Sequence, residues 1–329
     1  MRAPQFHRIA GMMLLGSLSL AAAPLAHAQA WPDRPVRIVV PFAAGAVTDI
    51  VSRLLADRLT PRLGKPVIID NRPGANAIVG AEVVAKAAPD GYTVLMAGSS
   101  THTVNPNLFK SLPYDSLKDF TEAVNFGGVR YYLTVSARSP IKTLPELLAN
   151  AKANPGKLNY GAGNSTALLA TELFKLVTNT DFAQINYKSN LNAATDLIGG
   201  TIQIAFLDVG VANGQIKSGH LRGIAYTGLS RSATLPDVPT FGELGFAELQ
   251  KISGWFGLWF PANTPKPIVD RFNREVNAVR DTPDFAAKMA EMGISLEGAG
   301  GTPEDFARFV REDLARWARV VKEAKIPLQ

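Results

Sequence analysis

The sequence predicts an α/β protein built from two domains. Short runs rich in β-branched residues alternate with segments in which apolar residues recur at helical spacing, and this alternation indicates strands and helices arranged in layers. The 329 residues are more than one ordinary hydrophobic core organises, which favours two domains. An apolar content of 47% with 19% charged residues is typical of a globular chain.

The first 28 residues have the pattern of a secretory signal peptide. Arg2 and Arg8 supply a positive start, residues 12–20 form a short apolar core, and Ala26-His27-Ala28 is a small-x-small cleavage site. The apolar core is too short for a membrane anchor, and no later segment has the roughly 18 uninterrupted apolar residues that a spanning helix needs. We therefore expect residues 1–28 to be a signal peptide that is cleaved after Ala28, and the mature protein to be exported.

The N-terminal part of the mature chain predicts one βαβαβ unit. Residues 36–40 read as a strand, which leads through the loop 41–48 into a helix that begins at about Asp49. Two further strands are expected at 67–70 and 92–97, with a second helix between them.

The middle part predicts a second α/β unit. Thr143 and Glu146 form a capping box at the start of one helix, and a glycine-rich loop at 161–166 precedes another. Strands are expected at 131–135, 158–160, 184–187, 203–206 and 221–226.

The C-terminal part predicts helices. Three Thr-Pro pairs each place a hydroxyl at the N-cap and a proline at the first helical position, namely Thr264-Pro265, Thr282-Pro283 and Thr302-Pro303. In the last helix, apolar residues from Phe306 to Val321 recur on one face, which indicates core packing.

Composition excludes several classes of function. The chain has no cysteine, which rules out disulfides, thiolate metal sites and cysteine nucleophiles. The net charge of +6 is spread along the chain without a basic run, which argues against a nucleic acid partner. After residue 28 only His102 and His220 remain among the histidines, so we expect no metal site and no cofactor.

Two loops between a strand and a helix are candidates for ligand binding. Ligands of open α/β sheets bind at the carboxyl ends of strands, and a helix N-terminus offers unpaired amides and a positive dipole end to an anion. The first loop is 41–48, in which Gly45 allows the backbone to approach a ligand closely, and the second is 161–166. The alternatives are an ordinary capped turn for the first loop, and a serine hydrolase that uses Ser165 with a histidine for the second.

A set of short motifs runs in order along the mature chain. It begins with Pro41-Phe42-Ala43-Ala44-Gly45 followed by Thr48-Asp49, and it continues at 71–75, 88–92, 101–102, 105–106, 235–240, 254–258 and 261–265. The first motif is similar to the PFxxGGxxD start of the substrate-binding proteins of tripartite tricarboxylate transporters, also called the Bug family. The later motifs resemble the same family across essentially the whole mature chain.

The resemblance implies a fold and a binding site. The fold is that of a type II periplasmic binding protein, in which two α/β lobes joined by crossover strands enclose a ligand cleft. Lobe I would comprise residues 29–129 and 252–329, and lobe II residues 130–251. The ligand-binding residues that the resemblance implies are Phe42, Ala43, Ala44, Gly45, Ala46, Thr48, Asp49, Ser99, Ser100, Asn164, Ser165, Thr166, Tyr187, Ser189 and Asp208.

The resemblance also implies a function. Such a protein captures a small carboxylate or a related organic anion in the periplasm and delivers it to the membrane permease of a tripartite transporter. We therefore expect a monomer that is not an enzyme and needs no cofactor. A periplasmic sensor for a signalling receptor is the alternative with the same fold. The chain departs from the family pattern at Ala46, Leu168 and Ser189, which predicts an altered ligand or an altered grip on it.

Overall fold

The structure is a computed structural model that describes residue 1 and residues 31–296, 299–323 and 326–328. The predicted signal peptide, apart from Met1, lies outside the described residues. Within the described residues, no helix combines the length and apolarity that crossing a bilayer requires.

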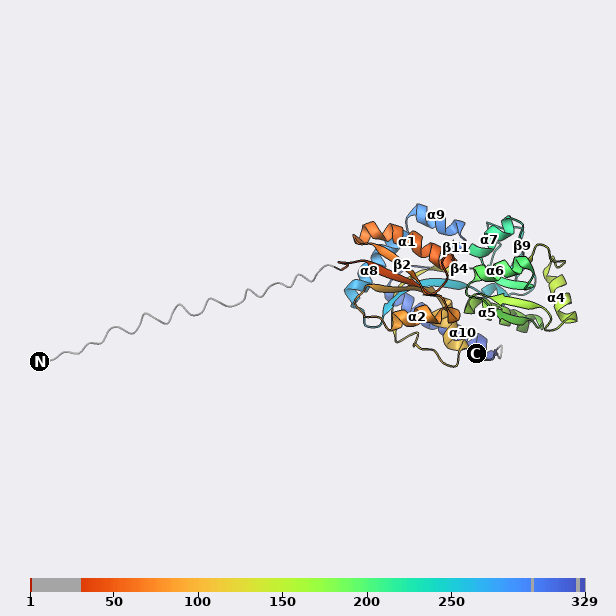
Figure 1. Ribbon diagram of the computed structural model, residues 1–329, viewed down its shortest axis with the longest axis horizontal. Coiled ribbons are helices and arrows are strands. Elements are labelled where there is room, and N and C mark those ends of the chain that lie inside the picture. The colour runs from red at the N-terminus through yellow and green to blue at the C-terminus, as the bar shows by residue number, and fades with distance from the viewer. Residues whose placement is uncertain (2–30, 297–298, 324–325, 329) are drawn as a thin grey trace.

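Two β-sheets organise the described chain, and the helices cover them (Figure 1). We call the six-stranded sheet with its helices lobe I and the five-stranded sheet with its helices lobe II. The strand order is β11-β4-β10-β3-β1-β2 in lobe I and β7-β6-β8-β5-β9 in lobe II. The α/β prediction is therefore confirmed.

The elements of lobe I come from both ends of the described chain. They are β1 (Val36–Val40), α1 (Val47–Leu63), β2 (Val67–Asn71), η1 (Ala75–Ala77), α2 (Ile78–Ala85), β3 (Thr93–Gly98), the π-helical turn η2 (Ser100–Val104), α3 (Asn105–Leu108), β4 (Phe120–Val129), β10 (Gly254–Pro261), α8 (Lys266–Arg280), α9 (Pro283–Glu291), β11 (Ile294–Ser295) and α10 (Pro303–Glu323).

The elements of lobe II come from the middle of the chain. They are β5 (Tyr131–Ser136), α4 (Leu144–Ala153), β6 (Asn159–Ala162), α5 (Ser165–Thr178), β7 (Ala183–Asn186), α6 (Asn190–Gly199), β8 (Ile204–Asp208), α7 (Val209–Lys217), β9 (Leu221–Tyr226) and the short turn η3 (Leu249–Lys251). The chain passes from lobe I to lobe II between β4 and β5, and it returns between β9 and β10.

The N-terminal βαβαβ unit is confirmed. Strand β1 pairs in parallel with β2 on one side and with β3 on the other. Side chains of β3 alternate between the two faces of the sheet, because Val94 and Met96 lie in one apolar cluster while Leu95 and Ala97 lie in the other. A sheet buried on both faces needs continuous apolar strands, which is why these segments were readable in the sequence.

Two central strands of lobe I, β4 and β10, were not predicted as strands. They pair with each other in antiparallel fashion and carry the crossings between the lobes. Every residue of β10 is buried, so the strand shows no alternation of polar and apolar residues. Glycines on both strands at one end of the pairing, including Gly128 and Gly254, give these segments the composition of a turn.

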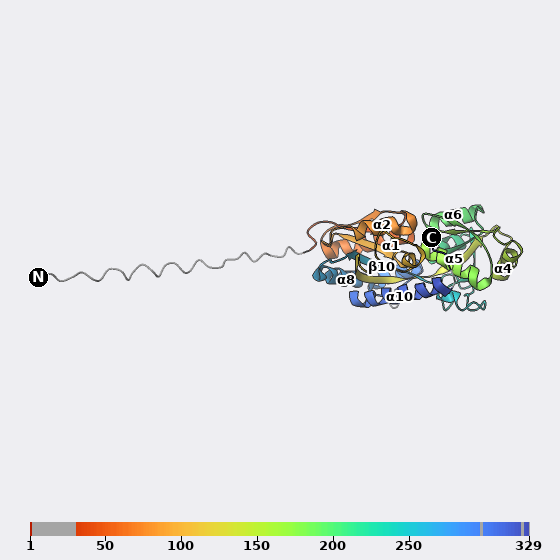
Figure 2. The same ribbon diagram turned by 90° about the horizontal axis from the view of Figure 1, so that it is seen from below.

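Of the three predicted Thr-Pro helix caps, one is confirmed. At the start of α10, Thr302 Oγ1 accepts a hydrogen bond from the Asp305 amide at 3.1 Å, and Asp305 Oδ2 accepts one from the Thr302 amide at 3.1 Å. At Thr264 the prediction is wrong, because Pro265 is the N-cap of α8 and the Thr264 hydroxyl donates to the Pro261 carbonyl oxygen. At Thr282 the predicted positions are correct, since Thr282 is the N-cap and Pro283 the first residue of α9, but the hydroxyl donates to the Val279 carbonyl oxygen and does not cap the helix. Helix α10 runs along one side of the molecule (Figure 2).

Candidate functional site

A cavity of about 50 Å³ lies where the two lobes meet. Lobe I contributes the start of α1, the end of β3 and the crossing segments of β4 and β10, while lobe II contributes the starts of β5 and of three helices. The lining residues are Phe42, Ala46, Val47, Thr48, Gly98, Ser99, Ser100, Val129, Tyr131, Gly163, Asn164, Ser189, Asn190, Leu191, Asp208, Val211, Gly254, Trp255 and Phe256. Neither lysine nor arginine occurs among these described lining residues.

Four helices begin at this cavity. Their N-cap residues are Ala46 of α1, Asn164 of α5, Ser189 of α6 and Asp208 of α7, and all four line the cavity. In lobe II the side chain of each N-cap residue accepts a hydrogen bond from an amide of its own helix. Four positive dipole ends around one cavity without a cationic side chain favour the binding of an anion.

Helix α1 differs from the other three because no side chain caps it. The amides of Val47, Thr48 and Asp49 find no acceptor within the described part of the chain. Gly45, which lies just before the helix, has a φ of +81°, a conformation that glycine adopts without strain. The first turn of α1 therefore presents free amide donors at the cavity.

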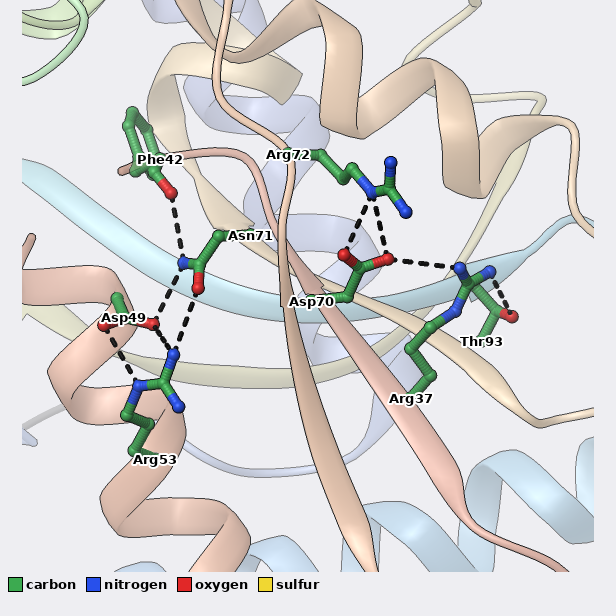
Figure 3. A network of polar contacts seen from close by, with 8 residues as sticks. All are labelled: Arg37, Phe42, Asp49, Arg53, Asp70, Asn71, Arg72 and Thr93. Carbon is green, nitrogen blue, oxygen red and sulfur yellow. Dashed lines mark hydrogen bonds and ion pairs between the residues drawn. The ribbon is translucent and has the colours of Figure 1, made fainter. Parts of the chain in front are cut away.

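Asp49 holds the loop before α1 in place (Figure 3). Its carboxylate accepts hydrogen bonds from the Gly45 amide at 2.9 Å, from Asn71 Nδ2 at 2.9 Å and from Arg53 Nε at 3.1 Å. Asn71 Nδ2 also donates to the carbonyl oxygen of Phe42 at 3.1 Å. Burial alone would raise the pKa of Asp49, but these hydrogen bonds and the Arg53 charge outweigh it and lower the pKa.

Asp208 is a buried carboxyl group on the cavity wall. Its Oδ2 accepts a hydrogen bond from Asn190 Nδ2 at 2.7 Å, and its Oδ1 accepts one from the Val211 amide at 3.2 Å. Burial raises the pKa of Asp208 above its ordinary value, and these hydrogen bonds offset only part of that rise. The two carboxyl groups therefore differ: burial determines the direction of the pKa shift at Asp208, whereas hydrogen bonds and the Arg53 charge determine it at Asp49.

Hydroxyl groups connect the two lobes beside the cavity. Thr166 Oγ1 of lobe II lies 2.9 Å from Ser99 Oγ and 3.1 Å from Ser100 Oγ of lobe I. Close by, Ser165 Oγ donates a hydrogen bond to Asn105 Oδ1 across the same boundary. These contacts hold the lobes together around the cavity.

The structure brings about half of the predicted binding residues to the cavity. Those that line it are Phe42, Ala46, Thr48, Ser99, Ser100, Asn164, Ser189 and Asp208. Those that do not line it are Ala43, Ala44, Gly45, Asp49, Ser165, Thr166 and Tyr187. In the second group, Asp49 forms hydrogen bonds that hold the loop before α1. Ser165 and Thr166 form hydrogen bonds between the lobes. The Tyr187 hydroxyl donates to Asp196 Oδ2 at 2.8 Å.

Several lining residues were missed by the sequence analysis. Tyr131, Trp255 and Phe256 lie at the crossings between the lobes, and no local pattern announces that these crossings border a ligand site. Burial raises the pKa of Tyr131, and the nearby Asp208 charge adds to the rise, so its hydroxyl stays protonated. Asn190 could have been found as the residue that follows the predicted Ser189, at the start of a helix.

The serine hydrolase alternative finds no support in the site. Ser165 donates to Asn105, and neither described histidine forms a hydrogen bond with it. His102 contacts Thr101 and stacks on Trp259, while His220 lies at the surface. Among the described residues, no group of three or more His, Asp or Glu side chains is arranged to hold a metal ion.

The family model of the tripartite tricarboxylate transporter family receptor matches residues 51–326. The chain belongs to this family. This confirms the resemblance seen in the sequence and identifies the chain as one of the family's periplasmic solute-binding receptors.

Relatives of this receptor extend over nearly its whole length. It is 35% identical over 311 residues to protein BugT of Bordetella pertussis, with 94% of each chain covered. The structure of Rpa4515 of R. palustris with adipate superposes with a TM-score of 0.86 at 32% identity, covering 91% of this chain and 100% of that one. MatC of Rhodopseudomonas palustris with bound malate gives a TM-score of 0.84 at 29% identity, with 88% and 99% covered. The two-lobed periplasmic-binding fold is thereby confirmed.

The three departures from the family pattern lie in different surroundings. Ala46 and Ser189 line the cavity at the starts of α1 and α6. Leu168 is buried in the apolar core at 1% exposure and does not line the cavity. Of the three positions in this receptor, only Ala46 and Ser189 can therefore change a contact with a ligand directly.

Proposed function

We propose that this receptor captures a small carboxylate or related organic anion in the cavity between its lobes and delivers it to the membrane permease of a tripartite transporter. The observation that carries the proposal is the convergence of four helix N-termini on a cavity whose described lining has no lysine or arginine. Backbone amides and helix dipoles then supply the positive potential that a carboxylate needs.

The comparisons support a carboxylate as ligand. Two structures similar to this receptor contain adipate and malate, which are both carboxylates. We infer that the anion accepts hydrogen bonds from the free amides at the start of α1, and that Thr48, Ser99, Ser100 and Asn164 complete its coordination. Asp49 and Thr166, which do not line the cavity, position these groups through their hydrogen bonds.

We also propose where the receptor works and how its two lobes move. We propose that residues 1–28 direct export, that cleavage follows Ala28, and that the mature receptor works in the periplasm as a monomer without enzymatic activity. Residues 29–129 with 252–329 form one moving unit and residues 130–251 the other. The lobes separate to admit the ligand and then close on it. The contacts of Thr166 with Ser99 and Ser100 favour the closed arrangement.

A ligand screen tests the proposal. The mature protein is titrated by calorimetry and heated in the presence of mono-, di- and tricarboxylates, with the corresponding amides as uncharged controls. We expect one carboxylate to bind saturably without being converted, and at 100 times its Kd to stabilise the fold by about 2.7 kcal/mol. Absence of binding by every carboxylate, or turnover of the bound compound, would contradict the proposal.

A capture experiment tests the partner. The liganded receptor is immobilised and exposed to detergent-solubilised inner membranes of the source organism. We expect recovery of a membrane permease of the tripartite type. Recovery of a signalling receptor in its place would favour the sensor alternative.

A further inference from the structure

The cavity contains one carboxyl group, that of Asp208, among its described lining residues. Asp208 lies at the end of β8, where it caps α7, and only 8% of the residue is exposed. Capping alone does not require an aspartate, because asparagine or serine caps a helix equally well. A buried carboxyl group on the wall of an anion-binding cavity therefore needs a further explanation.

The hydrogen bonds around Asp208 make its oxygens acceptors. The Gly163 amide can only donate, and it donates to Asn190 Oδ1 at 3.1 Å. The amide group of Asn190 is thereby oriented with Nδ2 toward Asp208, to which it donates at 2.7 Å. The second oxygen accepts from the Val211 amide.

These bonds do not use the full capacity of the carboxylate. An ionised carboxylate accepts about four hydrogen bonds. Asn190 Nδ2 and the Val211 amide supply two of good geometry, while the amides of Gly210 and of Asp208 itself stabilise the charge less directly. The remaining acceptor positions are on the Asp208 carboxylate, which lines the cavity. A ligand atom that fills it must carry a hydrogen.

The anion site and Asp208 lie close together across the boundary between the lobes. Gly210, two residues after Asp208, approaches Val47, the first residue of α1, so closely that a Cβ on Gly210 would lie 2.4 Å from Val47 Cγ2. The free amides of α1 and the carboxyl group of Asp208 therefore fall within the span of one small molecule. A ligand carboxylate placed directly against Asp208 would meet a like charge, whereas a donor placed there would be attracted.

We propose that Asp208 selects carboxylates that carry a hydrogen-bond donor, an ammonium or hydroxyl group, on a carbon near the carboxylate. This inference rests on the proposed function of carboxylate capture. The carboxylate binds at the start of α1, and the neighbouring donor binds Asp208. The class comprises small hydroxy acids and amino acids, as opposed to plain fatty or dicarboxylic acids of the same length.

Two matched ligand series test the inference by calorimetry. The first is succinate, malate and aspartate, and the second is propionate, lactate and alanine, so that only the donor changes within each series. We expect the hydroxy or amino member of at least one series to bind about tenfold or more tightly than its plain parent, since hydrogen bonds to charged groups have at least that effect.

The variant Asp208→Asn tests whether the Asp208 carboxylate causes this preference. Asparagine retains the size and the helix cap but lacks the charge, so we expect the preference for the donor-bearing member to fall below about threefold. Asp181→Asn is the control, because Asp181, between α5 and β7, pairs with Lys175 outside the cavity lining and should leave the preference unchanged. If Asp208→Asn does not fold, the ratios of the wild-type receptor decide alone.

The outcomes separate this inference from the proposed function. If plain and donor-bearing members bind equally, or if only carboxylates outside both series bind, the role of Asp208 is refuted while carboxylate capture stands. An undiminished preference in Asp208→Asn also refutes it. If no carboxylate of any kind binds, the proposed function itself fails.

Discussion

At the scale of the residue, the two aspartates near the cavity differ in what surrounds them. Asp49 is enclosed by donors from its own lobe and fixes the loop before α1. Asp208 accepts two hydrogen bonds of good geometry from the described residues, from Asn190 and Val211, and it lines the cavity. Their sequence contexts are similar, since each lies near a helix start after a strand, so only the structure separates a positioning role from a ligand contact.

We predict that Asp49→Asn weakens ligand binding. The substitution removes the charge that holds Arg53 and leaves fewer acceptors for Gly45 and Asn71, so the loop that presents the free amides loses its support. The Kd measured by calorimetry should rise about tenfold or more. Asp70→Asn is the matched control, because Asp70 pairs with Arg37 on the adjacent strand β1 and with Arg72 just after its own strand, without contacting the loop (Figure 3). Equal affinities of the two variants would contradict this role of Asp49.

His102 predicts how stability changes in acid. The side chain is fully buried and stacks on Trp259 with ring centroids 3.7 Å apart, and burial lowers its pKa from 6.5 to about 3. The unfolded chain therefore binds a proton at His102 below about pH 6.5, while the folded protein stays unprotonated there until about pH 3. Through this window, falling pH should lower the free energy of unfolding by up to about 1.4 kcal/mol per pH unit.

Urea unfolding at several pH values between 7 and 4 measures this contribution. Replacing His102 with glutamine should reduce the loss of stability per pH unit by about that amount. A His102→Gln variant that follows the wild-type slope would contradict the assignment.

At the scale of the element, the cavity depends on how closely helix starts approach one another. Gly163 shows this, because a Cβ there would lie 2.0 Å from the Asn190 amide nitrogen and 2.0 Å from the carbonyl carbon of Ser189. The glycine thus lets the loop before α5 lie against the start of α6. The same contact brings the Gly163 amide to Asn190, which orients Asp208.

We predict that Gly163→Ala destabilises the protein and weakens binding. The added methyl group must push α6 away from the loop, which should cost about 1–3 kcal/mol in the free energy of unfolding. Gly214→Ala is the control within α7, where a Cβ would meet nothing within 4 Å, and it should stabilise the protein by about 0.5–1 kcal/mol. Urea denaturation measures both. A Gly163→Ala variant as stable as wild type would show that the contact is not tight.

Helices and strands could be predicted from the sequence where the local residue pattern matches the environment of the segment in the fold. The parallel strands β1, β2 and β3 have apolar runs separated by helices, and the loops after β1 and β6 follow from that pattern. Strands β4 and β10 were missed, because their glycines imitate turns and their pairing joins segments more than a hundred residues apart. The part of the site that these strands supply, including Trp255 and Phe256, was missed for the same reason.

At the scale of the whole molecule, the cavity exists only while both lobes contribute to it. Helices and strands of both lobes supply the residues that line it. Beside the cavity, the hydroxyl group of Thr166 joins the lobes through its contacts with Ser99 and Ser100. A ligand that contacts both lobes stabilises the arrangement in which they touch. Affinity therefore depends on the population of that arrangement as well as on the contacts in the cavity.

We predict that Thr166→Val weakens binding by favouring separation of the lobes. The variant keeps the buried shape but loses the contacts with Ser99 and Ser100, which should raise the Kd about 3- to 30-fold. Small-angle scattering of the unliganded variant should give a larger radius of gyration than that of wild type. Thr171→Val is the control on the same helix, because the Thr171 hydroxyl bonds to Ala167 within α5. Identical behaviour of the two variants would rule out the role of Thr166.

The uncapped start of α1 has a consequence for how such a receptor changes its cargo over evolutionary time. The proposed grip on the anion consists of main-chain amides, which every residue except proline supplies. Replacing side chains around it, as at Ala46 or Ser189, alters the shape and polarity offered to the rest of the ligand while the grip persists. New cargo specificity can therefore arise through single substitutions without an intermediate that has lost the ability to hold an anion.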